Sequence, residues 1–280
     1  MNLGLLGGED ANAAFALSAA EGWNQTAADW RHLTRLEAAG CFAARAGQRL
    51  IGTVTTTTYG QALAWIGMMV VHPDFRRQGV GAALMRLALA YVRDLGIASV
   101  KLDATPAGRP LYESLGFVAE AELQRWQGVA RPAGGPKPRR QSAESLQSLL
   151  ALDKTAFGAD RSRLLELLIV EGLGGPQVVG SSRGTAEGYA IARQGRTATY
   201  IGPIVATSAA VVGQLLDGVF ARFAGEDVCL DVHGSGLLEP IMLEGRGLSP
   251  RRSLTRMRLG IDGAAGAARM VCASAGPEFG

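Results

Sequence analysis

The pattern of hydrophobic and polar positions divides the first half of the chain into helical and strand-like stretches. Apolar residues recur every three or four positions in some segments, and form alternating or β-branched runs in others. Thr26 followed by Asp29 is a capping-box-like start for one helix, and Gly96 is placed to end another. The predicted elements are helices over 11–20 and 26–39, strands over 41–45, 50–58 and 62–71, a helix over 79–95, a strand over 99–103, a helix over 109–115 and a strand over 117–126. This order, ααβββαβαβ, predicts an α/β or α+β domain with a central sheet.

The patterning breaks in the middle of the chain. The segment RPAGGPKPRR at 131–140 alternates prolines and glycines with basic residues and has nothing apolar to bury, which favours a linker over a loop within one domain. A length of 280 residues also suits two domains of roughly 100 to 200 residues each. We therefore expect domains over 1–130 and 141–262. The small residues of 263–280 keep no sustained period and predict a tail or at best a short edge strand.

Composition narrows the class of protein without naming a partner. Hydrophobic residues make up 48% of the chain and charged residues 19%, which is typical of a folded chain. A net charge of +3 does not favour nucleic acid as a partner, although the basic tract at 131–140 is the place to test for it. No apolar run reaches the roughly 20 residues that a membrane-spanning helix needs. The first residues lack the regions of a secretion signal. The three cysteines are widely spaced and no histidine has a partner at metal-ligand spacing, so we expect no metal and a cytoplasmic location.

One segment, MMVVHPDFRRQGVGAAL at 68–84, has the features of a phosphate-binding site. A helix that begins near Gly79 and Gly81 offers unpaired N–H groups and a positive dipole end, and glycine leaves room for a pyrophosphate. Arg76 and Arg77 can add charge-assisted hydrogen bonds. The spacing differs from both the dinucleotide-binding fingerprint and the P-loop. A tight strand-to-helix turn without a ligand is the alternative interpretation.

This segment, together with LYESLGF at 111–117, resembles the GNAT superfamily of N-acetyltransferases over about residues 1–128. The resemblance implies a mixed, mostly antiparallel central sheet flanked by helices. It also implies that acetyl-coenzyme A (acetyl-CoA), a cosubstrate used without a metal, pairs with a splayed strand and lays its pyrophosphate on the following loop. The coenzyme-binding residues implied are Met69, Val70, Val71, Arg76, Arg77, Gln78, Gly79, Val80, Gly81 and Ala82.

The same resemblance suggests catalytic roles. Tyr112 stands where GNAT enzymes carry the tyrosine that protonates the departing thiolate, although an aromatic residue packed against the sheet would fit the same position. The N–H of Met69 or Val70 is the natural donor to an oxyanion. Asp103 ends a strand where some relatives place a carboxylate base, and a cap on the helix after it is the alternative role.

Candidates for binding the acceptor come from the predicted helical hairpin, which commonly forms a wall of the acceptor pocket in GNAT proteins. Trp23, Trp30 and Asp29 are the residues we select there. Core packing is the alternative for at least one of the tryptophans. For Asp29 the alternative is a solvated helix face.

The second half of the chain repeats the order of the first. The corresponding segments are WIGMMV at 65–70 and YIGPIV at 200–205, LDA at 102–104 and LDV at 230–232, and PLYESLGF at 110–117 and PIMLEGRGL at 240–248. The second copy has no Arg-x-x-Gly-x-Gly sequence, and Met242 stands about where Tyr112 stands in the first. We therefore predict a tandem protein with a degenerate second GNAT-like domain that has lost coenzyme binding.

These inferences lead to one expected function and two alternatives. The expected function is transfer of the acetyl group of acetyl-CoA to a primary amine by direct attack in a ternary complex. We prefer a small-molecule acceptor because a fused second domain could close the groove that a peptide needs. The alternatives are a peptide or protein N-acetyltransferase and a non-catalytic acyl-CoA binding or regulatory module. The sequence does not decide whether the chain forms a homodimer.

Overall fold

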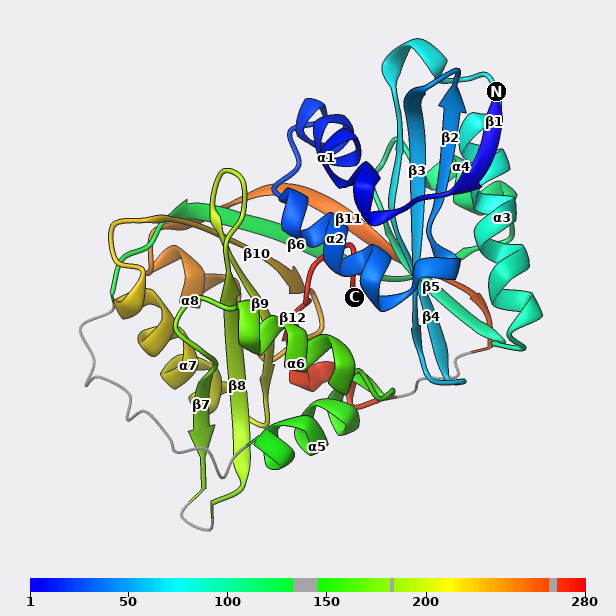
Figure 1. Cartoon of the computed structure of the whole chain (residues 1–280). Coiled ribbons are helices and arrows are strands. Elements are labelled where there is room, and N and C mark those ends of the chain that lie inside the picture. Colours follow the sequence, from blue (N-terminus) through cyan, green and yellow to red (C-terminus); the bar gives the residue numbers. More distant parts are fainter. Residues whose placement is uncertain (133–145, 182–183, 262–265) are drawn as a thin grey trace. The chain divides into compact units, whose positions relative to one another are not determined.

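The computed structural model describes residues 1–132, 146–181, 184–261 and 266–280 (Figure 1). The chain divides into two compact units. Unit 1 comprises Met1–Glu120, Arg256–Gly263 and Pro277–Gly280, and unit 2 comprises Ala121–Thr255 and Ala264–Gly276. Each unit therefore takes residues from both halves of the sequence, which a simple boundary near residue 130 does not describe. The linker expected at 131–140 lies outside the described residues except for its first two positions.

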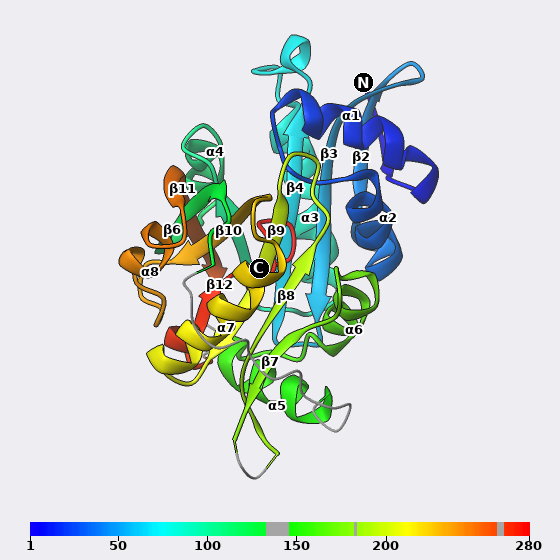
Figure 2. The same ribbon diagram turned by 90° about the vertical axis from the view of Figure 1, so that its left-hand side faces the viewer.

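Unit 1 is a sheet with helices on both faces. Its strand order is β1-β2-β3-β4-β5, followed by the Arg256–Gly260 part of β11 (Leu248–Gly260). The strands from β1 to β4 are antiparallel, and β4 and β5 are parallel. Helices α1 and α2 lie on one face of the sheet, and α3 and α4 lie on the other (Figures 1 and 2). The elements are β1 (Asn2–Leu5), η1 (Gly8–Asp10), α1 (Ala11–Ala20), α2 (Ala27–Leu36), η2 (Ala38–Gly40), β2 (Phe42–Ala46), β3 (Arg49–Tyr59), β4 (Leu63–Val71), η3 (Pro73–Phe75), α3 (Val80–Asp94), β5 (Ser99–Ala104), α4 (Arg109–Ser114) and the start of β6 (Val118–Val129).

The local sequence signals explain where several of these elements begin and end. The capping box predicted for α2 is confirmed, because the Thr26 side chain accepts from the Asp29 N–H while the Asp29 carboxylate accepts from the Thr26 N–H. Gly96, with φ +73°, ends α3 as predicted. Strand β1 was not predicted: NLGL is short and mostly exposed, and its conformation comes from pairing with β2.

Unit 2 repeats this architecture. From the Ala121–Val129 part of β6 its strand order is β6-β10-β12-β9-β8-β7. On β8, the Tyr189 hydroxyl donates to Asp153 of α5, whereas a side-chain carbon built on the neighbouring Gly188 would meet Val211 and Leu215 of α7. Successive strand residues point to opposite faces, so α5 and α7 cover opposite faces of the sheet. The elements are α5 (Leu146–Phe157), α6 (Ser162–Glu171), β7 (Gln177–Gly180), β8 (Ala186–Arg193), β9 (Thr199–Ala206), α7 (Ala209–Arg222), β10 (Asp227–His233), α8 (Pro240–Glu244), η5 (Ala268–Met270) and β12 (Val271–Ala273).

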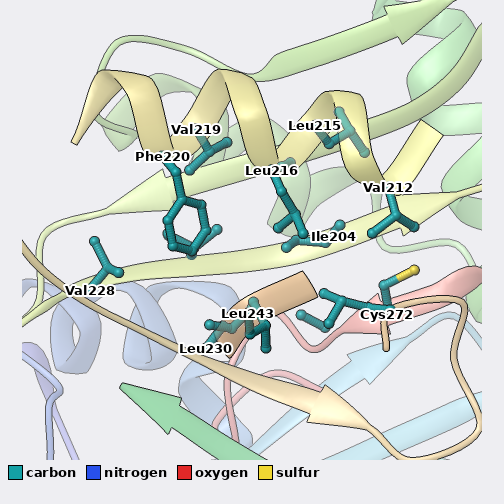
Figure 3. Packing of buried hydrophobic residues seen from close by; sticks show 14 of the residues in the cluster. Ile204, Val212, Leu215, Leu216, Val219, Phe220, Val228, Leu230, Leu243 and Cys272 are labelled. Carbon is teal, nitrogen blue, oxygen red and sulfur yellow. The ribbon is translucent and has the colours of Figure 1, made fainter. Parts of the chain in front are cut away.

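The core of unit 2 lies between α7 and the strands beneath it. Figure 3 shows the apolar side chains of this helix directed onto β9 and β10, with Leu243 of α8 and Cys272 of β12 beside them. The helix contributes Val212, Leu215, Leu216, Val219 and Phe220. A matching core in unit 1 joins α3 to β2–β5 and includes Leu84, Ala88 and Val92.

Residues 271–280 do not form the expected tail or edge strand. β12 pairs on both sides, with Val232 of β10 and with Ile204 and Val205 of β9, so it lies inside the sheet of unit 2. Farther along the chain, Phe279 is fully buried within unit 1.

Three further features concern the cysteines, possible metal sites and possible membrane-spanning helices. The cysteines, Cys41, Cys229 and Cys272, are free and buried, and burial raises the pKa of the Cys41 thiol to about 12. Within the described residues, no group of three or more histidine, cysteine or acidic side chains is arranged to hold a metal ion. None of the helices described there is long and apolar enough to cross a membrane.

Candidate active site

Strands β4 and β5 of unit 1 separate partway along their length. They pair in parallel at Ala64–Val100 and Trp65–Lys101, and no pairing beyond these positions joins them in the described part of the chain. A β-bulge marks the start of the separation, because Met68 has φ +49° and the register against β3 shifts between Thr55–Gly67 and Thr53–Val70. From the bulge onward, β4 has an open edge of backbone groups.

The register shows which backbone groups of β4 face this open edge. The His72 N–H donates to the Ile51 carbonyl at 2.8 Å, so Val70, opposite Thr53, is the next residue whose N–H and C=O point toward β3. Val71 and Met69 therefore point away from β3, and the Arg76 Nε indeed reaches the Val71 carbonyl at 2.9 Å. Of the two oxyanion donors predicted from the sequence, Met69 is on the open side.

The loop after β4 forms a run of unpaired donors. Arg77 has φ +61° and Gly79 has φ +80°, and Gly79 is the N-cap of α3 with no side-chain cap. Among the described residues, no hydrogen-bond acceptor is found for the backbone N–H groups of residues 77–82. Several consecutive N–H groups at the positive end of a fifteen-residue helix suit an anion such as a pyrophosphate.

The polar side chains of this loop differ in their contacts. Arg76 forms an ion pair with Glu21 in addition to its bond to Val71, and Gln78 Nε2 donates to the Asp74 carbonyl at 2.9 Å. Arg77 is exposed. Arg76 therefore positions the loop in this state, and Arg77 is the arginine that is available to phosphate.

Tyr112 lies on α4, next to the N-terminus of α3. A side-chain carbon built on Gly81 would lie 3.4 Å from Leu111, which shows how closely α4 approaches the first turn of α3. The Tyr112 ring packs edge-on against Phe117 at 6.1 Å, and the residue is buried. Burial raises the pKa of the Tyr112 hydroxyl, so the side chain keeps its proton at neutral pH.

Asp103 is bound by an arginine that the sequence did not associate with it. Arg256, on the part of β11 that belongs to unit 1, donates through Nε to Oδ1 at 2.9 Å and through Nη2 to Oδ2 at 3.0 Å. Its guanidinium lies 4.6 Å from the centre of the Trp65 ring. Both carboxylate oxygens accept charge-assisted bonds, which favours a structural role for Asp103 over that of a base.

Unit 2 contains the same ion pair at the corresponding positions. Arg125 of β6 binds Asp231 through Nε–Oδ1 at 2.8 Å and Nη2–Oδ2 at 2.5 Å, and lies 5.8 Å from the Tyr200 ring. Burial disfavours the charged carboxylate, but Arg125 outweighs it and lowers the pKa of Asp231. Trp65 and Asp103 in the first copy thus correspond to Tyr200 and Asp231 in the second, as the sequence repeat predicts.

The candidate acceptor residues on the α1–α2 hairpin have mainly structural contacts. Trp30 is fully buried and its Nε1 donates to Ser18 Oγ at 3.1 Å, which fits the core-packing alternative. The Asp29 carboxylate belongs to the capping box of α2. Trp23 is partly exposed.

Four residues that sequence reasoning missed pack on the hairpin side of β3 and β4. The segment Pro277–Gly280 is held by Tyr59, whose hydroxyl donates to the Phe279 carbonyl at 2.5 Å, and by Trp65, whose Nε1 donates to the Pro277 carbonyl at 2.9 Å. Gln25 Nε2 donates to the Glu278 carboxylate at 2.6 Å. These contacts join positions more than two hundred residues apart, and no local pattern indicates them.

In unit 2 the equivalent strand edge is filled. β9 and β10 pair in parallel only at Thr199–Val228 and Tyr200–Cys229, and then β12 lies between them. The turn from β9 to α7 is short, and the Ser208 side chain caps the helix by accepting from the Val211 N–H. Pro203, which has no N–H, stands where Met68 stands in unit 1.

Both halves of the chain match known families. Residues 11–117 match the family described as "Acetyltransferase (GNAT) family", and residues 149–269 match "Acetyltransferase (GNAT) domain". Over 170 residues the chain is 27% identical to the uncharacterized N-acetyltransferase YitH of Bacillus subtilis, and the match covers 58% of each protein. Over 86 residues it is 35% identical to the mycothiol acetyltransferase of Thermomonospora curvata, covering 30% of this chain and 29% of that protein. The chain thus spans less than two thirds of the length of these curated relatives.

A solved structure matches the chain along its whole length. It is a putative acetyltransferase from Pyrococcus horikoshii, with a TM-score of 0.86, 22% sequence identity, and coverage of 100% of this chain and 95% of that one. A GCN5-related N-acetyltransferase from Sphaerobacter thermophilus matches with a TM-score of 0.66 at 16% identity, covering 95% of this chain and 96% of that one. At these identities the likeness concerns the fold.

Proposed function

Because the chain belongs to the GNAT acetyltransferase family in both of its halves, we propose that unit 1 binds acetyl-CoA and transfers the acetyl group to a primary amine. The observation that carries this proposal is the open edge of β4 next to the unpaired N–H groups of residues 77–82. An extended pantetheine arm can pair with the edge while the pyrophosphate receives the N–H groups. Bound acetyl-CoA supplies a thioester whose carbonyl carbon accepts the amine.

The protein's own groups then have distinct tasks. The Met69 N–H, on the open side of the bulge, donates to the carbonyl oxygen as it gains negative charge. The ammonium form of the acceptor first loses a proton to water, which for an alkyl amine of pKa near 10.4 costs about 4 kcal/mol at pH 7.4. We assign the proton for the departing thiolate to the Tyr112 hydroxyl, because Tyr112 lies on α4, the helix that approaches the first turn of α3. The proton that the nitrogen gives up after attack replaces, through water, the one transferred to the thiolate.

A small acceptor fits this site better than a peptide. The backbone of Glu278 packs directly on Gly67, at the bulge where the acetyl carbonyl is expected, and the rest of Pro277–Gly280 lies against Tyr59 and Trp65. These residues occupy the hairpin side of β4 that an extended peptide would have to cross.

Replacing Tyr112 by Phe tests the acid. We expect the rate at which the amine releases the CoA thiol from acetyl-CoA to fall by roughly 100-fold, a usual contribution of general acid catalysis. The Kd for CoA should stay unchanged. Steady-state assays across a panel of primary amines measure the first quantity, and calorimetry the second. Tyr91→Phe is the matched control, because it removes a hydroxyl that bonds to Glu37 at 2.6 Å on the far part of α3 and should affect stability alone. Unchanged turnover in Tyr112→Phe would show that Tyr112 packs against the sheet and does not act as the acid.

For unit 2 we propose that no coenzyme binds. Its strand edge already pairs with β12, and its helix α7 begins with a serine cap. Wild-type protein that binds CoA but acetylates no amine would point instead to the non-catalytic binding module.

A further inference from the structure

We propose that unit 2 binds a small-molecule carboxylate at the guanidinium of Arg252, in a row of charged side chains that also contains Arg125 and Asp231. All three residues belong to unit 2. The proposed acetyl transfer takes place in unit 1 and uses none of them. The inference therefore stands or falls separately from that function.

The register between β6 and β11, which are neighbours in the sheet, follows from two contacts within unit 2. The Arg131 N–H donates to the Arg246 carbonyl at 3.0 Å. Farther along both strands, the Thr255 hydroxyl donates to the Glu122 carboxylate at 3.0 Å. The residue number falls on one strand as it rises on the other, so the strands are antiparallel and these two pairs stand opposite each other.

This register places two arginines directly opposite each other. Counting along both strands from either of the two pairs brings Arg252 of β11 opposite Arg125 of β6. On the other side of Arg125, Asp231 of β10 is its partner in the sheet. Residues that stand opposite each other have their side chains on the same face, and like charges in such a pair are destabilising. The row thus contains two guanidinium groups and one carboxylate.

The carboxylate in this row is already occupied by other partners. Arg125 binds both oxygens of Asp231, and the Tyr200 hydroxyl donates to Oδ2 at 3.1 Å. The Arg252 guanidinium makes no hydrogen bond or ion pair with any residue that the structure describes, and its Nε is buried without an acceptor there. Burial lowers the pKa of Arg252 and the charge of Arg125 lowers it further, but an arginine keeps its proton in proteins. The row therefore has an unbalanced positive charge.

A carboxylate is the anion that suits this charge. The Arg252 side chain is partly exposed, so a ligand from the solvent can reach it. Arg125 and Arg256 each bind an aspartate through two parallel N–H groups, and a third guanidinium offers the same fork. One carboxylate brings the charge of the row to zero, whereas a phosphate monoester carries about −1.5 to −2.

Arg252→Met tests the site in the full-length protein. An NMR titration that follows the methyl resonance of acetate measures the Kd for this probe, with chloride added to hold the ionic strength constant. We expect Arg252→Met to weaken the Kd for acetate by at least about tenfold, because charge-assisted hydrogen bonds are lost. Arg251→Met is the matched control. Arg251 is exposed and, as the adjacent residue of the strand, points to the opposite face, so this variant should keep the wild-type Kd.

The unfolding midpoint separates a binding role of Arg252 from a structural one. At low ionic strength and without a carboxylate in the buffer, Arg252→Met should unfold at the wild-type temperature or above it, because the change removes a like charge opposite Arg125. A lower midpoint would assign Arg252 to the structure of the sheet and overturn the inference. A wild type that binds no acetate, or equal Kd values for acetate in Arg252→Met and the wild type, would also overturn it. Inorganic phosphate is titrated in parallel, and tighter binding of phosphate than of acetate would contradict a carboxylate ligand.

Discussion

Replacement of Gly81 by Glu is expected to abolish acetyl-CoA binding. Gly81 is the second residue of α3, within the run of unpaired N–H groups, and a side-chain carbon there would lie 2.8 Å from Met69 Cε and 3.8 Å from Val71. A glutamate would therefore enter the space between α3 and the open edge of β4 and set a negative charge beside the pyrophosphate. Juxtaposed like charges cost several kcal/mol, so the Kd for CoA should weaken by roughly 1000-fold or more. Isothermal titration calorimetry measures this directly.

The matched control is Ala210→Glu in unit 2. Ala210 is the second residue of α7, as Gly81 is of α3, and it is exposed. A glutamate in the first turn of a helix is favourable, so this variant should be at least as stable as the wild type and should bind CoA normally. CoA affinity that survives Gly81→Glu, or that falls equally in Ala210→Glu, would show that the N–H groups of residues 77–82 do not bind the pyrophosphate.

Replacement of Arg256 by Ala is expected to destabilise unit 1 strongly. It leaves the Asp103 carboxylate, which is fully buried, without its bidentate partner and removes the guanidinium from the Trp65 ring. Breaking a buried ion pair from one side costs about 3–5 kcal/mol. At about 4 °C per kcal/mol the unfolding midpoint of unit 1 should fall by roughly 10–20 °C in calorimetry or circular dichroism.

A double variant separates the ion pair from other effects. Asp103→Leu with Arg256→Met replaces both charges by apolar groups and should recover most of the lost stability, because such pairs are often neutral or favourable to replace. Asp103→Asn, assayed well below its unfolding midpoint, should keep most of the wild-type turnover. A large loss of turnover in folded Asp103→Asn would restore the base role suggested by its sequence position.

The sequence predicts most of what depends on local structure. The helices of unit 1, the capping box at Thr26, the helix end at Gly96 and the strands β2, β3 and β4 follow from spacing and turn chemistry, which act over a few residues. The repeat of WIGMMV and YIGPIV also predicts that Trp65 and Tyr200 occupy equivalent positions, and both lie beside an arginine–aspartate pair.

The features that sequence patterning missed all depend on contacts between distant segments. Strands β6 and β11 change units partway, so Arg256 reaches Asp103 across more than 150 residues of chain. The segment that carries Glu278 has small residues and no period, and its order comes from Tyr59, Trp65 and Gly67. β12 is likewise fixed by the strands on either side of it. Such pairings are set by tertiary packing and leave no local signal.

The contrast between an open strand edge in unit 1 and a filled one in unit 2 is the basis of the functional account. The stoichiometry of acetyl-CoA binding to the wild-type chain, measured by isothermal titration calorimetry, tests it most directly. The account predicts one molecule of acetyl-CoA per chain. Two molecules per chain would contradict the role assigned to β12, and no binding would contradict the role assigned to the N–H groups of residues 77–82.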